Sequence, residues 1–497
     1  MIRRRTALSL ALPLTAGLTP LAALAQRSKD SLVLAMTLEP PGLDPTAGAA
    51  AAIAEVVQYN VLETLTKIQS DSSISPLLAQ RWTVTPDNKT WAFHLRPGVR
   101  FQNGEPCNAA SVKFSFERAA AADSTNKDKA VFTNIVNIRA TDDLTLVITL
   151  KNTNPDLLFQ LGQATAVIVE PRSAATNATQ PVGTGPYKLE SWTKGSALVL
   201  ARWDGYRDVQ QVALRRVTIR FISDGAAQVA ALLAGDVDLF PRVAVARSLA
   251  QFKADKRFQV LVGGSRAKTI VAINNKKKPL DDVRVRRAIA MAIDRKQVVD
   301  GVADGFGTPI GSFYVPGSPG YVDLTSVNAY NPDKARALLK EAGITTPLEL
   351  SLKLPPTPYA RQGGEVIAAM LAKVGIVVKQ EGVEWAQWLA GVYAQKAYDL
   401  TIISHLEPLD FGNFARPGYY WNYESPKFND LWARINSTAD VPQRLKLLAE
   451  AQRLVADDAV AAYLYQPTWI TVAHAKLKGV WTDMPIFAND LAALRWA

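Results

Sequence analysis

The segment from Pro76 to Arg118 constrains the fold more than any other part of this chain, because it sets a strand, two tight turns and a helix in close succession. Apolar residues alternate with polar or small ones over 91–95, which is the period-two pattern of a half-buried strand. Pro-Gly at 97–98 and Asn-Gly at 103–104 mark turns. The residues after Asn108, a good N-cap, carry one apolar stripe at helical spacing. The pattern predicts a strand that leads into an amphipathic helix.

The first 25 residues have the three parts of a secretory signal. Arg3–Arg5 form a basic start, Ala7–Leu18 is an apolar run, and Ala23–Ala25 reads A-x-A, so we expect cleavage after Ala25. The run is about twelve residues, short of the ~20 that cross a bilayer. The arginines also resemble part of a twin-arginine signal, and the export route is left open. No cysteine follows the A-x-A, which favours a free periplasmic protein over a lipoprotein.

Composition indicates a folded, multidomain chain. Hydrophobic residues make up 48% and charged residues 20% of 497 residues, which is typical of a folded chain. A chain of this length is too long for a single hydrophobic core, so we expect two or more domains. The net charge of +11 is scattered without interleaved aromatics, so we expect no nucleic-acid partner. The single cysteine, Cys107, cannot form an internal disulfide, and we interpret it as a small buried apolar residue.

Helices and strands are predicted to alternate along the rest of the chain. A helix capped by Asp282 runs through an apolar stripe to Ile293, and Asn331 with Pro332 begins another that ends near Gly343. A helix over 365–375 is expected to lead into a buried strand at 376–378. Such alternation predicts mixed α/β units with covered sheets. Gly183 and Gly185 lack the spacing of a phosphate loop, so we interpret them as a sharp turn where the chain passes between lobes.

Four segments carry a resemblance to a known family: 76–118, 181–206, 221–240 and 279–305. Together they resemble the extracellular solute-binding proteins of peptide, opine and nickel ABC importers, called family 5. The resemblance implies an α/β periplasmic-binding-protein fold with two lobes and a hinge, in its type II, large three-subdomain variant. It also implies a monomer that works with an ABC permease and ATPase complex in the inner membrane.

The same resemblance divides the chain into lobes. Lobe 1 would combine 26–55, 181–268 and 476–497, with an additional subdomain over 56–180. Lobe 2 would be the continuous block 269–475. The chain would cross between lobes near Lys268 and near Ala475, and a two-strand hinge suits rigid-body closure on a ligand.

The stretch 399–429 is the strongest candidate for a ligand site, because a strand leads into a loop dense with carboxylates and aromatics. In peptide binders the corresponding loop supplies an aspartate for the ligand's ammonium. Here the matching place holds Glu407, with Asp410 nearby. These two carboxylates either bind a ligand cation or are solvated loop charges. The loop's aromatics either line the cleft or belong to the core; the candidates are Tyr419, Tyr420 and Trp421.

Two other segments are expected to face the same cleft. Tyr359 and Arg361 stand where peptide binders hold the ligand carboxylate, and Arg361 could bind it through two parallel hydrogen bonds. Trp385 and Trp388 follow a strand at helical spacing and could equally be packing residues. Near the N-terminus, Glu39 belongs to a loop of the kind that lines the cleft in the family.

The sequence offers no catalytic pattern of the common hydrolase kinds, neither GxSxG nor HExxH. We therefore expect a binding protein without enzymatic activity or cofactor, whose ligand is a short peptide or an opine-like amino-acid derivative. One alternative in the same family is a nickel or metal-chelate binder, for which His405 and Glu407 are too small a ligand set to predict a metal site. An alternative of another class is an extracytoplasmic chaperone or interaction protein on this fold.

Overall fold

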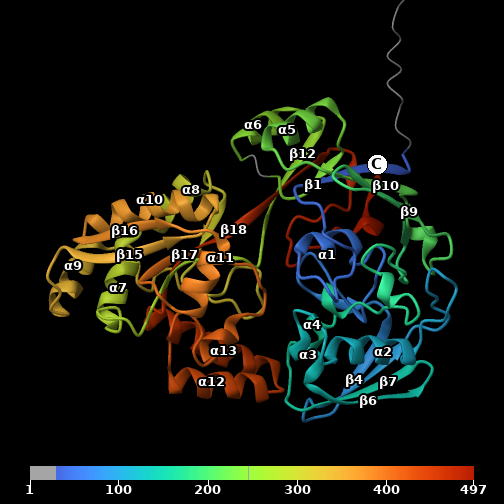
Figure 1. Ribbon diagram of the computed structural model, residues 1–497, viewed down its shortest axis with the longest axis horizontal. Coiled ribbons are helices and arrows are strands. Elements are labelled where there is room, and N and C mark those ends of the chain that lie inside the picture. Colours follow the sequence, from blue (N-terminus) through green and yellow to red (C-terminus); the bar gives the residue numbers. More distant parts are fainter. Residues whose placement is uncertain (1–28, 244–245) are drawn as a thin grey trace, which may run out of the picture.

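The computed structural model describes residues 29–243 and 246–497, so the predicted signal segment 1–25 lies outside the described residues. Two lobes lie side by side and join at the top of the view in Figure 1. Lobe 2, in yellow and orange, contains α7–α13. Lobe 1, in blue and green, contains α1 and β8–β10, and its cyan subdomain contains α2 and α3 (Figure 1). Within the described ranges, no helix is both long and apolar enough to span a bilayer.

One large sheet runs through both lobes. Its path is β16-β15-β17-β13-β18-β11-β1-β10-β9-β8, and β12 and β14 pair with β18 beside this path. In path order the strands are Ile376–Gly382, Leu348–Leu354, Leu400–His405, Lys268–Ile273, Ala461–His474, Leu239–Phe240, Ser31–Met36, Arg216–Phe221, Ala197–Arg202 and Tyr187–Thr193, and β12 and β14 are Phe258–Gly264 and Gly307–Pro309.

Strand β18 connects the two lobes. Its first half pairs with β13 of lobe 2, as far as Tyr465. Its second half pairs with β12 of lobe 1, from Thr468 to His474. The other connection runs from β12 into β13 through Ser265–Ala267. The change of partner along β18 thus comes before Ala475, and the sequence-based lobe boundaries remain predictions.

The central strand of lobe 2 shows why the sheet is covered on both faces. All six residues of β13 are buried. Val271 and Ile273 belong to one apolar cluster, and Ile270 and Ala272 to another, because successive side chains of a strand point to opposite faces. The lobe's helical segments are α7 Val283–Ala292, α8 Arg295–Val302, α9 Pro332–Glu341, α10 Pro358–Ala372, α11 Trp385–Gln387, a π-helical turn Trp388–Ala394, a 3-10 turn Phe411–Ala415, α12 Pro426–Ser437 and α13 Val441–Asp457.

Lobe 1 surrounds two further apolar clusters, one on each side of β1. Asp224 caps α5 with its side chain, and Gly235 ends the helix in the left-handed conformation. The remaining elements of this lobe are α1 Ala51–Val57, α5 Gly225–Ala234, α6 Leu249–Ala254, the 3-10 turns Val209–Gln211, Ala246–Ser248 and Leu491–Ala493, and the strand pair β19 Leu477–Lys478 and β20 Arg495–Trp496.

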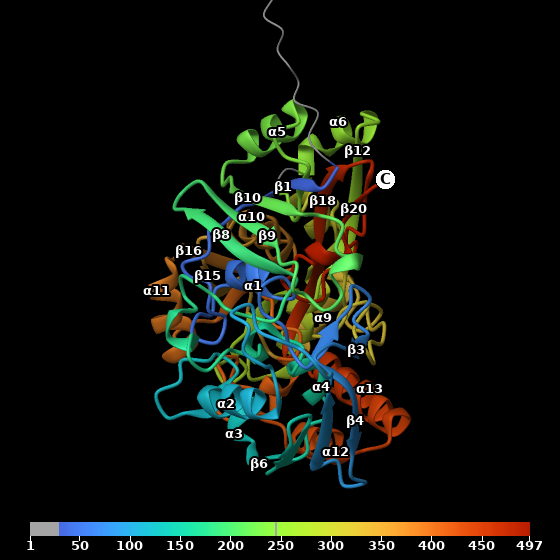
Figure 2. The same cartoon turned by 90° about the vertical axis from the view of Figure 1, so that its right-hand side faces the viewer.

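The subdomain is a four-stranded antiparallel sheet with helices on one face (Figure 2). Trp91, Phe93 and Leu95 are buried together against α2, and Asn108 caps that helix with its side chain, so both sequence predictions are confirmed. Cys107 is buried in the same cluster, and burial raises the pKa of its thiol to about 12. The elements are β4 Ala79–Val84, β5 Thr90–Leu95, β6 Ile135–Asp142, β7 Thr145–Leu150, α2 Ala109–Ala120, α3 Lys129–Thr133, α4 Leu157–Gln160, the 3-10 turns Ala164–Ala166 and Ala174–Thr176, and the adjoining pair β2 Thr66–Ile68 and β3 Ile74–Pro76.

The glycines at 183 and 185 mark a close approach of two backbones. A Cβ on Gly183 would lie 1.9 Å from the carbonyl oxygen of Val61, and one on Gly185 would lie 2.3 Å from that of Asn60. Gly185 N–H donates to Val61 O at 3.0 Å. Only glycine allows this contact, so the predicted tight turn is present. The turn packs against residues 60–61 within lobe 1, however, and not between the two lobes as the sequence suggested.

One predicted helix boundary was wrong. The helix expected over 365–375 begins at Pro358 and ends at Ala372. Proline is favoured in the first turn because it has no N–H to leave unsatisfied there. The correction matters for the site, since Tyr359 and Arg361 now lie in the first turn of α10.

Candidate binding site

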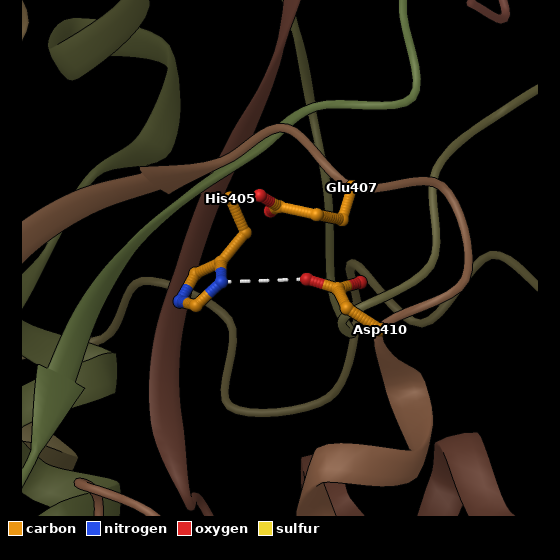
Figure 3. Close-up of side chains that lie close together, drawn as sticks. All are labelled: His405, Glu407 and Asp410. Atoms are coloured by element: carbon orange, nitrogen blue, oxygen red, sulfur yellow. Dashed lines mark ion pairs between the residues drawn. The ribbon is translucent and has the colours of Figure 1, made fainter. Parts of the chain in front are cut away.

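Strand β17 ends at His405, and a group of polar side chains lies at and just after this end of the strand. In Figure 3, His405, Glu407 and Asp410 lie close together, and their ligand atoms are all within 4.8 Å of one another. His405 is buried, while Glu407 is exposed. Glu407 and Asp410, the two carboxylates expected to bind a ligand cation, thus lie close together in space, and their part in binding remains a prediction.

A lysine that the sequence analysis did not select for the site completes this group. Lys268 is the first residue of β13 and lies opposite His405 in the strand pairing. Its ammonium donates to Asp410 Oδ1 at 2.5 Å and to the carbonyl oxygen of Glu407 at 2.5 Å. The Lys268 and Asp410 side chains are only 3% and 8% exposed, so this is a buried ion pair. Its one sequence signal is a lysine at the head of an otherwise apolar strand.

The second oxygen of Asp410 faces His405. Oδ2 lies 3.3 Å from His405 Nδ1 but is buried without a well-aligned hydrogen bond. Burial alone would raise the pKa of the Asp410 carboxyl, but the Lys268 ammonium and the His405 ring hold that pKa below its usual range. The other ring nitrogen, His405 Nε2, lies 2.9 Å from the Tyr420 hydroxyl, which fixes the orientation of the imidazole.

The charges in this group favour an organic cation over a metal ion. The Asp410 carboxylate is paired with Lys268, whereas no cationic side chain among the described residues pairs with the carboxylate of Glu407. The Lys268 ammonium repels any cation bound by these ligands, and it repels a divalent ion about twice as strongly as a singly charged ammonium at the same distance. One imidazole and two carboxylates are also a poor set for nickel.

The predicted aromatic residues divide into core and surface. Trp388, Tyr420 and Trp421 are at most 5% exposed and belong to an apolar cluster of lobe 2. Trp388 Nε1 donates to Thr401 Oγ1 at 3.0 Å, as a core residue with a satisfied polar atom does. Only Trp385, at 42% exposed, and the half-buried Tyr419 present a surface that a ligand could reach.

The remaining candidates have protein partners in this structure. The Tyr359 hydroxyl accepts from Ser404 N–H at 3.1 Å, so it supports the end of β17. Arg361 donates to Pro355 O at 3.2 Å and lies 3.8 Å from the Glu384 carboxylate, with 45% of its side chain exposed. Glu39 accepts from Trp192 Nε1 and from Gly195 N–H, both at 2.9 Å. Their part in binding a ligand remains a prediction.

Comparison with known proteins supplies the family. The model of the bacterial extracellular solute-binding proteins, family 5, matches residues 73–420. The chain belongs to this family. Its members are the solute-binding components of ABC importers, and the two-lobe fold of periplasmic binding proteins predicted from the sequence is confirmed.

Relatives whose names refer to different ligands match this chain over most of its length and of their own. Heme-binding protein A of Haemophilus influenzae is 27% identical, over 90% of this chain and 88% of its own. The dipeptide-binding protein of Escherichia coli is also 27% identical, over 91% and 92%. The structure of AgaA from A. tumefaciens R10, in complex with agropinic acid, matches with a TM-score of 0.78 and 26% identity, over 94% of this chain and 99% of that one.

Proposed function

We propose that this protein captures a short peptide or an opine-like amino-acid derivative in the periplasm and delivers it, as a monomer, to an ABC permease of the inner membrane. The main support is the carboxylate of Glu407, which lies beside the buried Lys268–Asp410 ion pair and has no ion-pair partner of its own among the described residues. A primary ammonium, as on a peptide or amino acid, donates three hydrogen bonds and fits a site with one carboxylate free of an ion pair and several oxygen acceptors. Trp385 and Tyr419 would add apolar surface next to it.

The experiment that tests this proposal is native mass spectrometry of the purified protein, followed by identification of the small molecules released on denaturation. We expect an intact solute with an amino group, bound at one copy per chain and released without chemical change. A released nickel chelate would favour the metal-binding alternative. If no molecule is retained and a panel of peptides and amino-acid conjugates fails to bind, the proposal is wrong.

Solute should also favour the arrangement in which the lobes meet. Lobe 2 contacts the subdomain of lobe 1 through Arg444 and Asp156, whose side chains form an ion pair of 2.7 Å. The Thr153 hydroxyl donates to Asn436 O beside it. Because two short segments join the lobes, we expect ligand to shift a rigid-body equilibrium.

Small-angle scattering measures this shift. With the identified solute at saturation, the radius of gyration should fall relative to the solute-free protein. Arg444→Gln, which removes a partly exposed ion pair, should make the solute-free protein only slightly more open. An unchanged radius on solute binding would argue against closure about the two connecting strands.

A further inference from the structure

Arg266 is a buried cation that has no hydrogen-bond or ion-pair partner among the residues that the structure describes. It lies between β12 and β13, where the chain passes from lobe 1 to lobe 2, and its side chain is 7% exposed. Throughout residues 29–243 and 246–497, no hydrogen bond or ion pair involves its guanidinium. Burial lowers the pKa of Arg266 to about 10, only partly opposed by Tyr314. A buried charge without a partner costs stability, so such a residue calls for an explanation.

Three other arginines that are buried or half-buried have protein partners. Arg207 forms two hydrogen bonds to the Glu63 carboxylate, both at 2.7 Å. Arg286 donates to the carbonyl oxygens of Leu280 and Asp458. Arg295 donates to that of Tyr463 at 2.8 Å. The contrast shows that this fold normally pairs the arginines it buries and leaves Arg266 unpaired.

Arg266 lines a cavity of about 420 Å³ at the hinge, which we call the hinge cavity. Its wall includes Thr308 and Gly317 of lobe 2, Asp71 and Asp483 of lobe 1, and Thr468 of the connecting strand β18. A cavity of this size is large enough for a small organic group. Because both lobes and both connections contribute to the wall, the cavity depends on how the lobes are arranged.

Among the described residues that line the hinge cavity, Arg266 has the one cationic side chain. The Thr468 hydroxyl is buried without a hydrogen bond and can donate to an anion. The carboxylates of Asp71 and Asp483 lie at exposed residues and bind the N–H groups of Ser73 and Gly264 instead. Exposed charges are screened by water and salt, whereas the buried guanidinium is not.

The backbone next to Arg266 is held in place by hydrogen bonds of the preceding residue, Ser265. The Ser265 hydroxyl donates to Pro467 O at 2.6 Å, and the Gln466 amide donates to Ser265 O at 2.6 Å and to Pro316 O at 3.0 Å. These bonds tie the two connecting segments together. A backbone that is ordered before the ligand arrives loses no further conformational entropy on binding.

We propose that Arg266 binds a carboxylate group in the hinge cavity and that this carboxylate belongs to the captured solute. The inference rests on the proposed function and specifies the solute as an acid. Guanidinium and carboxylate match in shape and can form two parallel hydrogen bonds. An anion bound there would touch both lobes and favour their closure. It also gives Arg266 a role that the sequence analysis assigned to Arg361.

The test uses protein freed of retained solute by unfolding and refolding, and compares binding of dipeptides as free acids and as C-terminal amides. Sodium acetate and sodium sulfate serve as free anions. Hydrogen bonds to charged groups contribute about 1.5–3 kcal/mol, so wild type should bind the acids about 10- to 100-fold more tightly than the amides. In Arg266→Met this preference should fall below about threefold, and Arg266→Lys should keep part of it. Arg81→Met, at an exposed arginine of β4, is the matched control and should behave as wild type.

Thermal unfolding gives a second readout that does not depend on the panel. Without added anion, Arg266→Met should have a higher Tm than wild type, because it removes an unpaired buried charge. If acetate or sulfate raises the Tm only when Arg266 is present, and acids and amides then bind equally, the site is an anion site whose ligand is separate from the solute.

An anion site whose ligand is separate from the solute would overturn the proposal that the solute supplies the carboxylate, and two further outcomes would overturn the proposal as a whole. One is that neither the acids nor the free anions show any dependence on Arg266. The other is that the preference for acids survives Arg266→Met and disappears in Arg361→Met. In either case a solute identified by mass spectrometry would leave the proposed function standing, so the two failures are distinguishable.

Discussion

Lys268→Met is expected to lower the free energy of unfolding by about 3–5 kcal/mol, because it leaves the buried Asp410 carboxylate without its charge partner. The two side chains are 3% and 8% exposed, and the ammonium also satisfies the carbonyl oxygen of Glu407. Urea unfolding followed by tryptophan fluorescence measures the change. In the double variant Lys268→Met/Asp410→Asn most of the loss should be recovered, since no buried charge then remains unpaired.

The matched control is Lys276→Met. Lys276 forms an ion pair of 2.5 Å with Glu424, but both side chains are more than half exposed, at 55% and 60%. Exposed pairs contribute about 0–1 kcal/mol. Equal losses at the two lysines would show that the Lys268–Asp410 pair is as solvated as a surface pair, and the account of the site given above would be wrong.

The same pair determines how stability changes in acid. The folded protein holds the pKa of Asp410 below its usual value of 3.8, so the unfolded chain takes up a proton at this residue first as the pH falls. The stability from the ionised carboxylate is therefore present above about pH 4 and is lost as the pH falls through the folded pKa. The double variant should lose stability less steeply below pH 4 than wild type. Urea midpoints between pH 2.5 and 5 test this, and parallel curves would contradict it.

Local elements of the fold could be predicted because their signals are local. The strand β5 follows from alternation over 91–95, and α2 follows from its Asn108 cap and apolar stripe. The start of α10 was missed because the apolar pattern alone begins later than the helix, whose first turn is set by Pro358. Boundaries depend on such single residues more than on periodicity.

The site was only partly predictable because it depends on pairings across the chain. Lys268 and Asp410 are 142 residues apart and meet through the pairing of β13 with β17. No local pattern shows that partnership. For the aromatic residues at 419–421 the local pattern is visible but ambiguous, because aromatic side chains occur both in ligand clefts and in cores. The structure places Tyr420 and Trp421 in the core. Arg266 could not be selected from the sequence, because the lack of a partner for its guanidinium depends on the folded structure.

Glu407→Gln should weaken solute binding by a factor on the order of 30 to several thousand, if Glu407 pairs with the solute's ammonium when the lobes close. Removing one member of a desolvated charge pair costs about 2–5 kcal/mol, from which that factor follows. The substitution keeps shape and volume and removes only the charge. In the described residues no cationic side chain forms an ion pair with this carboxylate, which accepts a hydrogen bond from the Leu406 N–H at 3.1 Å. The charge is thus available to a ligand.

Isothermal titration with the solute identified by mass spectrometry measures this effect. Glu424→Gln is the matched control, since Glu424 is exposed and lies after the aromatic stretch of the same loop. It should change the affinity by less than about threefold, or roughly 0.7 kcal/mol. An equally small effect of Glu407→Gln would show that Glu407 stays solvated in the complex. The ammonium would then have to bind Asp410 Oδ2, the buried oxygen without a hydrogen-bond partner, and affinity would depend on the Lys268–Asp410 pair instead.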